Sequence, residues 1–186
     1  MKIAPPKMNN NIVKEIGSDI KKGLIGVIPT DTIYGIVCSA MNKKSVEKLY
    51  KIRKRDLMKP MIILISSIKD LSLFDVKIEK KITDKYWPGK TSIIVPVTKF
   101  NYLHRNKKSL AFRLPDNKDL IKVIKISGPI VAPSANIEGK EPAQTIEEAY
   151  AYFQDKVDFY VSCGKLKSKP SKVISLINDK VEIIRK

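Results

Sequence analysis

The sequence predicts an α/β protein of one domain, with a mixed β-sheet that is covered by helices on both faces. Short apolar runs typical of strands alternate along the chain with segments of helical periodicity. Some of these runs are continuous, which is typical of strands buried on both faces. Two strand-like segments follow each other directly near the start, and another pair forms a hairpin near the end, so antiparallel pairs are expected beside parallel ones.

The first half of the chain begins with a predicted helix at residues 11–22, where apolar side chains recur every three or four residues and Gly23 follows. Apolar runs at 24–28 and 33–37 predict two short strands, and residues 45–53 again have helical spacing. The remaining elements of this half are a continuous apolar strand at 61–65, short helices at 68–74 and 78–86, and a strand at 92–98.

The second half continues the alternation to a closing hairpin. The predicted elements are strands at 109–114, 129–132 and 157–162, and helices at 119–126 and 145–153. Residues 172–177 and 181–184 are joined at Asn178-Asp179, a polar pair that favours a tight turn between two strands. The sequence contains no internal repeat, low-complexity tract or domain linker.

Composition limits the class of protein. With 186 residues and 43% hydrophobic side chains, the chain is long enough for one sizeable core. No apolar run approaches the ~20 residues that cross a bilayer, and the N-terminus lacks the apolar segment of a signal peptide. Cys38 and Cys163 lack the spacing of a disulfide framework or a zinc site. We therefore expect a cytoplasmic protein without membrane contacts.

The charge points to anionic partners. Thirty-six Lys and Arg residues against nineteen Asp and Glu give a formal net charge of +17, which favours nucleotides or RNA, although lysines spread over a solvated surface would give the same total. Arginine is more informative because its guanidinium binds phosphate through paired hydrogen bonds. The arginines are Arg53, Arg55, Arg105, Arg113 and Arg185.

Polar side chains gather where the predicted strands and one helix end, which is where α/β folds place ligands. VIPTDTIYG ends a strand in threonines, and YKIRKRDLMKP puts a basic cluster at a helix C-terminus, where the helix dipole alone also favours cations. In IVAPSANIEG, Ser134 and Asn136 are typical of residues that cap a turn, while the small Ala135 between them would let backbone N–H groups approach a phosphate, as in an anion nest. Arg113 interrupts the apolar run of SLAFRLPD, so if it is buried it needs a partner, for example a ligand carboxylate.

WPGKTS contains the GKT of a phosphate-binding P-loop but is not one. The motif requires a glycine five residues earlier, in a turn from a strand into a helix. Asp84 occupies that position, a predicted helix precedes the segment and a strand follows it.

Together these segments resemble one family. PTDTIYG, the basic cluster that ends in Lys59-Pro60, YWPG, FRLPD and APSAN occur in the order and at the intervals of the YrdC family, whose members are threonylcarbamoyl-AMP synthases. CGKLKSKPSKVISL is similar to the family's glycine-rich turn and proline-serine strand. The resemblance spans roughly residues 12–185. It implies a YrdC-like open, twisted, mixed sheet flanked by helices, with residues 1–186 as a single domain and no additional C-terminal domain.

The resemblance also implies site residues. Threonine-binding positions are matched by Thr30, Thr32, Arg113 and Ala132, with Arg113 at the substrate carboxylate. ATP-binding positions are matched by Arg55, Lys59, Ser109, Ser134, Asn136 and Ser171. Catalysis is assigned to Arg53, Arg55 and Lys59, as charges that stabilise the leaving pyrophosphate. Arg53 departs from the family's lysine, and Lys90 and Lys172 are further departures that affect the expected phosphate contacts.

The implied reaction joins ATP, L-threonine and bicarbonate or CO2 into threonylcarbamoyl-AMP and pyrophosphate. Such phosphorus chemistry depends on positioning and charge, so no protein nucleophile is expected. Mg²⁺ would accompany ATP without a dedicated carboxylate site on the protein. The product would pass to threonylcarbamoyl-transferase machinery that modifies an adenosine next to the anticodon of tRNA, and direct tRNA contact is left open.

Several other residues are expected to have no part in the reaction. His104 is expected in a solvated loop, Tyr86 and Trp87 in a hydrophobic corner, and Cys38 and Cys163 as small buried side chains. Asp31 is expected to cap a turn, with a water-mediated metal role left open.

Two alternative functions compete with synthesis. A non-catalytic RNA-binding module would use the +17 surface, but the sequence lacks an RNP-like aromatic pair and an arginine-rich segment. An enzyme that adenylates carbamate itself, like the YrdC-like part of hydrogenase-maturation proteins, would carry zinc-finger-like and acylphosphatase regions that this sequence does not supply.

Overall fold

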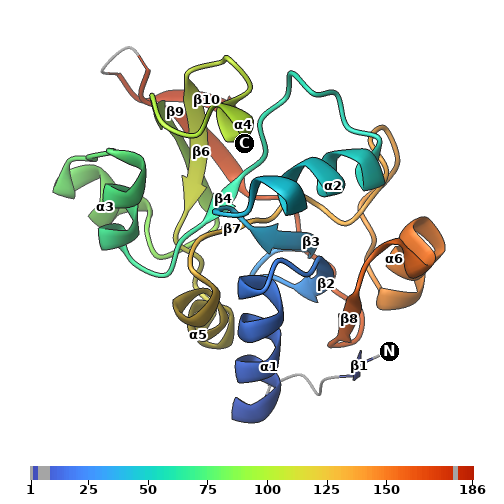
Figure 1. Cartoon of the computed structure of the whole chain (residues 1–186). Coiled ribbons are helices and arrows are strands. Elements are labelled where there is room, and N and C mark those ends of the chain that lie inside the picture. The colour runs from blue at the N-terminus through green and yellow to red at the C-terminus, as the bar shows by residue number, and fades with distance from the viewer. Residues whose placement is uncertain (1, 4–8, 178–179) are drawn as a thin grey trace.

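The computed structural model describes residues 2–3, 9–177 and 180–186 and shows a mixed sheet flanked by helices (Figure 1). Within these residues ten strands follow the order β1-β8-β2-β3-β7-β4-β6-β5-β9-β10, so β1 and β10 form the two free edges of an open sheet. The strands are β1 (Lys2–Ile3), β2 (Gly26–Pro29), β3 (Tyr34–Ser39), β4 (Ile63–Leu64), β5 (Thr91–Pro96), β6 (Ser109–Arg113), β7 (Ile130–Val131), β8 (Phe159–Ser162), β9 (Lys172–Ser175) and β10 (Glu182–Arg185).

Parallel and antiparallel pairs occur in the same sheet, which confirms the predicted mixed fold. β8 pairs in parallel with β1 and β2, as do β4 with β6 and β5 with β9. The other neighbours are antiparallel, including the β9–β10 hairpin, whose predicted turn at Asn178-Asp179 lies outside the described residues.

The helices cover both faces of the sheet. They are α1 (Asn10–Lys21), α2 (Lys43–Arg53), α3 (Lys80–Tyr86), α4 (Asn101–His104), α5 (Lys118–Ser127) and α6 (Ile146–Phe153), with 3-10 helices η1 (Ile68–Phe74) and η2 (Gln154–Lys156). Successive strand residues contribute to different cores: Val27 packs in the cluster under α2 and α6, and Ile28 packs in the cluster under α1 and α5. Helices α1 and α5 lie side by side (Figure 1), and a Cβ at Gly17 would lie 2.7 Å from that of Ile126, so their close packing requires glycine there.

Most predicted elements are present with shifted ends. The strand at 61–65 pairs only over Ile63–Leu64. The helix at 68–74 is a 3-10 helix that begins with a capping box formed by Ser67 and Asp70. Three elements were not predicted: the two-residue strand β1, the short helix α4 and the three-residue 3-10 helix η2, because none of them is long enough to show a periodicity.

Three local predictions have clear outcomes. His104 was wrongly predicted to be solvated: it is only 5% exposed, because α4 packs against α2 and β6. Cys38 is fully buried as predicted, but Cys163 is only partly buried. Trp87 is buried in the larger core with Tyr86 packed against that core, which confirms the hydrophobic corner. No helix in the described part of the chain is long and apolar enough to cross a membrane.

Candidate functional site

A cavity of about 240 Å³ opens where the ends of several strands and helix α2 meet. The β2–β3 turn, the ends of β6, β7 and α2, and the β9–β10 hairpin all contribute to it. Its lining includes the predicted site residues Thr30, Thr32, Arg53, Arg55, Arg113, Ala132, Ser134 and Ser171. Lys59, Ser109 and Asn136 were also predicted at the site but do not line the cavity.

Thr30 and Thr32 build the turn between β2 and β3. The Thr30 hydroxyl donates to the carbonyl of Ile33 at 2.7 Å and accepts from the backbone N–H of Thr32 at 3.1 Å, and the two hydroxyl oxygens are also 3.1 Å apart. Both side chains are buried at the cavity wall. The hydroxyl of Thr30 is therefore largely used by the turn, so Thr32 is the better candidate for contact with a ligand.

Arg113 meets Asp31 behind the cavity wall. Nη2 of Arg113 lies 3.0 Å from Oδ1 of Asp31, and the two side chains are only 4% and 3% exposed. Burial raises the pKa of Asp31 and lowers the pKa of Arg113, while the opposite charge of each partner works against both shifts. Asp31 therefore supplies the partner that the sequence required for Arg113, rather than capping a turn. Nε of Arg113 is buried and has no hydrogen-bond partner among the described residues.

Arg53 and Arg55 point in different directions because Lys54 between them has the left-handed conformation, with φ 51°, at the C-terminus of α2. Arg53 is 2% exposed, and its Nε and Nη2 donate to the backbone and side-chain oxygens of Asn136 at 3.0 and 2.9 Å. Ser134 joins this network by donating to Oδ1 of Asn136 at 2.6 Å. Burial, and then the charge of Arg55, lower the pKa of Arg53 to about 10.

These contacts give Arg53, which lines the cavity, and Asn136, which does not, a shared role in shaping the cavity wall. Nδ2 of Asn136 donates to the carbonyls of Ile137 and Lys140, so its side chain holds the loop after β7 in shape. Arg53 anchors that loop and thereby positions Ser134, whose side chain does line the cavity.

Arg55 and Lys59 lie in the loop that follows α2. Nε and Nη2 of Arg55 donate to the carbonyls of Lys59 and Pro60, which fixes the guanidinium at the cavity rim. Lys59 is exposed, and its Nζ lies 3.2 Å from Oε1 of Glu138, which is also 3.8 Å from Nη1 of Arg55. The hydroxyl of Tyr50 donates to the carbonyl of Lys59 and ties this loop to α2.

Ser171 and Arg185 form the opposite wall. Nε and Nη2 of Arg185 donate to the carbonyl of Ser171 at 2.9 and 2.7 Å, and Ser171 shares a hydroxyl hydrogen bond with Ser92 at 3.0 Å. The sequence interpretation did not assign Arg185 to the site. The signal was available, because Arg185 ends an apolar strand, as Arg113 does.

Ser109 and Ala132, two of the predicted site residues, lie at different distances from the cavity. Ser109 begins β6 and pairs with Pro96, at the end of the strand opposite to Arg113. Ala132 directly follows β7 at the cavity, where its backbone N–H donates to the carbonyl of Ile62. The departures Lys90 and Lys172 adjoin each other, since the N–H of Lys172 donates to the carbonyl of Lys90.

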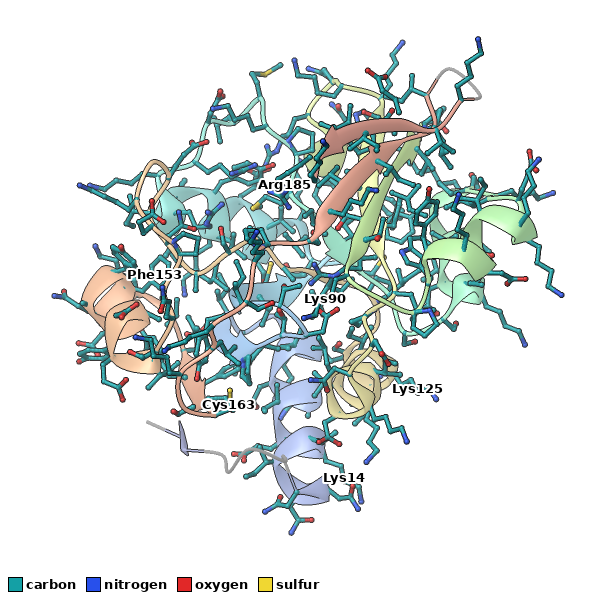
Figure 2. The ribbon with its side chains drawn as sticks, turned by 180° about the vertical axis from the view of Figure 1, so that it is seen from behind. Lys14, Lys90, Lys125, Phe153, Cys163 and Arg185 are labelled. Atoms are coloured by element: carbon teal, nitrogen blue, oxygen red, sulfur yellow. The ribbon has the colours of Figure 1, made fainter. Side chains whose placement is uncertain are left out.

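The charge of the lining is positive. Arg53, Arg55, Arg113 and Arg185 all line the cavity, and the described residues include no cluster of three or more His, Cys, Asp or Glu side chains that could hold a metal ion. Seen from behind, Arg185 lies at the end of β10, whereas Lys14 and Lys125 lie on α1 and α5 at the other end of the molecule (Figure 2). Basic side chains thus occur at both ends, and it is the convergence of arginines that marks the site.

The fold and this cavity define an α/β protein with a polar, arginine-lined pocket for an anionic ligand at the strand ends. A family model described as "Telomere recombination" matches residues 18–186, and the chain belongs to this Sua5/YciO/YrdC family.

Relatives support the assignment over most of the chain. A Methanocaldococcus jannaschii protein, whose name assigns it provisionally as a threonylcarbamoyl-AMP synthase, is 34% identical over 177 residues, which are 94% of this chain and 84% of the relative. A threonylcarbamoyl-AMP synthase of Buchnera aphidicola is 28% identical over 181 residues, 92% of this chain and 96% of the relative.

A solved structure shares the fold. Pyrococcus abyssi Sua5 in complex with L-threonine matches with a TM-score of 0.91 and 24% identity, over 99% of this chain and 56% of that chain. This chain therefore spans little more than half of the Pyrococcus protein.

Proposed function

We propose that this protein is an L-threonylcarbamoyl-AMP synthase, which converts ATP, L-threonine and bicarbonate or CO2 into threonylcarbamoyl-AMP and pyrophosphate. One observation carries the proposal: a single small cavity has a buried arginine at one wall and further arginines at its rim and opposite wall. Those charges suit a carboxylate and a polyphosphate held in one pocket. The names of the relatives supply the reaction to which this pair of ligands belongs.

The threonine end would be the wall formed by Thr32, Arg113 and Ala132. Arg113 is held by Asp31 through Nη2, while its buried Nε–H lacks a partner among the described residues. A substrate carboxylate would satisfy that donor. The Thr32 hydroxyl would suit the polar side chain of the substrate.

The nucleotide end would be the rim around Arg55, Ser134 and Ser171, with Lys59 reaching in from the surface loop. Arg55 is already fixed by two backbone carbonyls, so its charge is preorganised for phosphate. Arg185 would add a second guanidinium from the opposite wall. Arg53 would act by positioning Ser134, and Ser109 is too far along β6 to be assigned a phosphate contact from this geometry.

The chemistry needs no protein nucleophile. The threonine amine forms a carbamate with CO2 and loses a proton, and a carbamate oxygen then attacks the α-phosphorus of ATP. The bond from that phosphorus to the bridging oxygen breaks, and pyrophosphate leaves with the electron pair. The protein would hold the reactants in line, and Arg55 and Lys59 would stabilise the charge on the leaving group.

Magnesium would enter the site as part of the substrate, MgATP. The cavity lining consists of cations, hydroxyls and apolar groups, so it fits a metal carried by phosphate oxygens and water better than a metal held by protein carboxylates. We also propose that the product passes to a partner that modifies tRNA, and direct contact with tRNA is a separate proposal that the positive surface supports.

The decisive experiment measures pyrophosphate release from MgATP, with threonine and bicarbonate each present or omitted. Release that needs both, and that fails with serine or alanine, is the expected result. Release without threonine would instead indicate an enzyme that adenylates carbamate. No release in any mixture, together with salt-sensitive RNA binding, would indicate a binding module.

A further inference from the structure

The carboxylate of Glu138 contacts Arg55 and Lys59, the two cations that the proposed function assigns to phosphate. Its Oε1 lies 3.2 Å from Nζ of Lys59 and 3.8 Å from Nη1 of Arg55. Its Oε2 accepts a hydrogen bond from the backbone N–H of Asp56 at 2.6 Å. One carboxylate thus accepts hydrogen bonds from Lys59 and from the Asp56 backbone and lies within ion-pair distance of Arg55, in the way that a phosphate group would.

The rest of Arg55 is held independently of Glu138. Nε and Nη2 donate to the carbonyls of Lys59 and Pro60, so the guanidinium would keep its place if the carboxylate moved away. The group that faces Glu138 is Nη1, and Arg55 lies at the cavity rim. A polyphosphate that approached this side of Arg55 would therefore meet a negative charge already in position.

Glu138 is also able to move. Its side chain is 26% exposed and that of Lys59 is 59% exposed, so both can be solvated when they separate. Glu138 belongs to the loop after β7, and its backbone N–H donates to the carbonyl of Arg53 at 3.0 Å. That backbone bond keeps the loop attached to α2 while the side chain rotates.

We propose that Glu138 is an internal competitor of the nucleotide phosphates for Arg55 and Lys59, and so sets the affinity for ATP. This inference rests on the proposed function, because it needs a polyphosphate at the rim. In the free protein the carboxylate pairs with both cations and with the backbone of the loop between them. Binding of ATP replaces it, and departure of pyrophosphate returns it, so Glu138 weakens ATP binding and speeds release of the leaving group.

The test compares Glu138→Gln with the wild type. Glutamine keeps the size of the side chain and an oxygen that can accept from Asp56, but it removes the charge. We expect the Kd for MgATP, measured by calorimetry at low salt, to fall about three- to tenfold, as expected when one repelling charge beside a bound anion is removed. Binding of inorganic tripolyphosphate should tighten by a similar factor, while AMP and threonine should change by less than about twofold.

The matched control is Glu141→Gln, which removes the same charge three residues further along the same segment. Its ATP affinity should stay within about twofold of the wild type. Unchanged or weaker ATP and tripolyphosphate binding by folded Glu138→Gln would overturn the inference, and would show that Glu138 only supports the loop. Equal tightening in both variants would also overturn it, because that would reflect net charge alone. If the wild type bound no ATP, the proposed function would fail first, and the inference with it.

Discussion

The two ends of the cavity hold their arginines in opposite environments. Arg113 faces Asp31 with both side chains almost fully excluded from solvent, whereas Arg55 and Lys59 share Glu138 at the surface. A buried ion pair is separated only at a high cost in desolvation, while an exposed pair exchanges its partners readily with water and ions. The same type of contact therefore fixes one cation permanently and leaves the other available for exchange with a ligand.

Breaking the buried pair should give the largest effect. Asp31→Ala leaves Arg113 charged and without its partner, and we expect a loss of about 3–5 kcal/mol in the free energy of unfolding. Urea denaturation of Asp31→Ala, Arg113→Ala and the double variant would measure this. The double variant should lose clearly less than the sum of the two single losses, and strict additivity would contradict the pairing.

Removing Arg55 should affect the reaction instead of the fold. We expect Arg55→Ala to lower pyrophosphate release about 10²- to 10³-fold, as for loss of a preorganised charge, while the free energy of unfolding changes by less than about 1 kcal/mol. Lys51→Ala, an exposed change on α2, is the control with the same loss of charge. Full activity of Arg55→Ala would remove this residue from the site.

The buried pair should also make stability depend on pH. Burial raises the pKa of Asp31 above its usual 3.8, so its contribution to stability is greatest below that value and is lost as pH rises through the folded-state pKa. In Arg113→Ala the positive charge that favours ionised Asp31 is gone. We therefore expect the free energy of unfolding to fall by about 1–2 kcal/mol more between pH 4 and 7 than it does in the wild type. Urea denaturation at several pH values measures how the free energy of unfolding changes with pH. Equal changes in the two proteins would show that Arg113 does not influence the ionisation of Asp31.

Ser134 tests the region between the two ends. Ser134→Ala removes the hydroxyl that donates to Asn136, and we expect a loss of about 1 kcal/mol in stability and about a tenfold fall in pyrophosphate release. Ser72→Ala, which removes a hydroxyl bond to a carbonyl within η1, provides a control for stability alone. Unchanged activity of Ser134→Ala would exclude that side chain from the nucleotide end.

The smallest effect should come from the surface pair. A double-mutant cycle on Lys59 and Glu138 in the free protein should give a coupling of about 0.2–1 kcal/mol at 0.1 M salt, and close to none at 1 M, since exposed charges are screened. The Asp31–Arg113 coupling should change little over the same range. A salt-resistant coupling at Lys59 would mean that the two ends do not differ as proposed.

Periodicity predicted most of the fold but not its shortest parts. The spacing of apolar side chains in residues 11–22 predicted α1. In contrast, β1 has only two residues and is defined by its pairing with β8. His104 follows the same logic, because its polar neighbours predict a loop, while its burial depends on contacts with distant elements.

The site was predictable as a set of residues but not as a set of contacts. The motifs identified most of the lining, yet they did not show that Arg113 is paired with Asp31 or Lys59 with Glu138. Charges distant in sequence become partners only through the sheet order, and a sequence pattern does not encode that order. Arg185 was missed although it directly follows a strand of the predicted hairpin, because its contact with Ser171 at the cavity wall is seen only in the structure.

The separation in sequence between residues that line the cavity and the residues that hold them in place has a consequence for how the protein folds. Arg53 and Asn136 are 83 residues apart and Tyr34 and Cys163 are 129 apart, yet hydrogen bonds join each pair. Contacts of this range close large loops, so forming them costs chain entropy and slows folding. Arg185 completes the wall only after the last described strand has paired. We therefore expect ligand binding to report on the complete fold, because residues from both ends of the chain line the pocket.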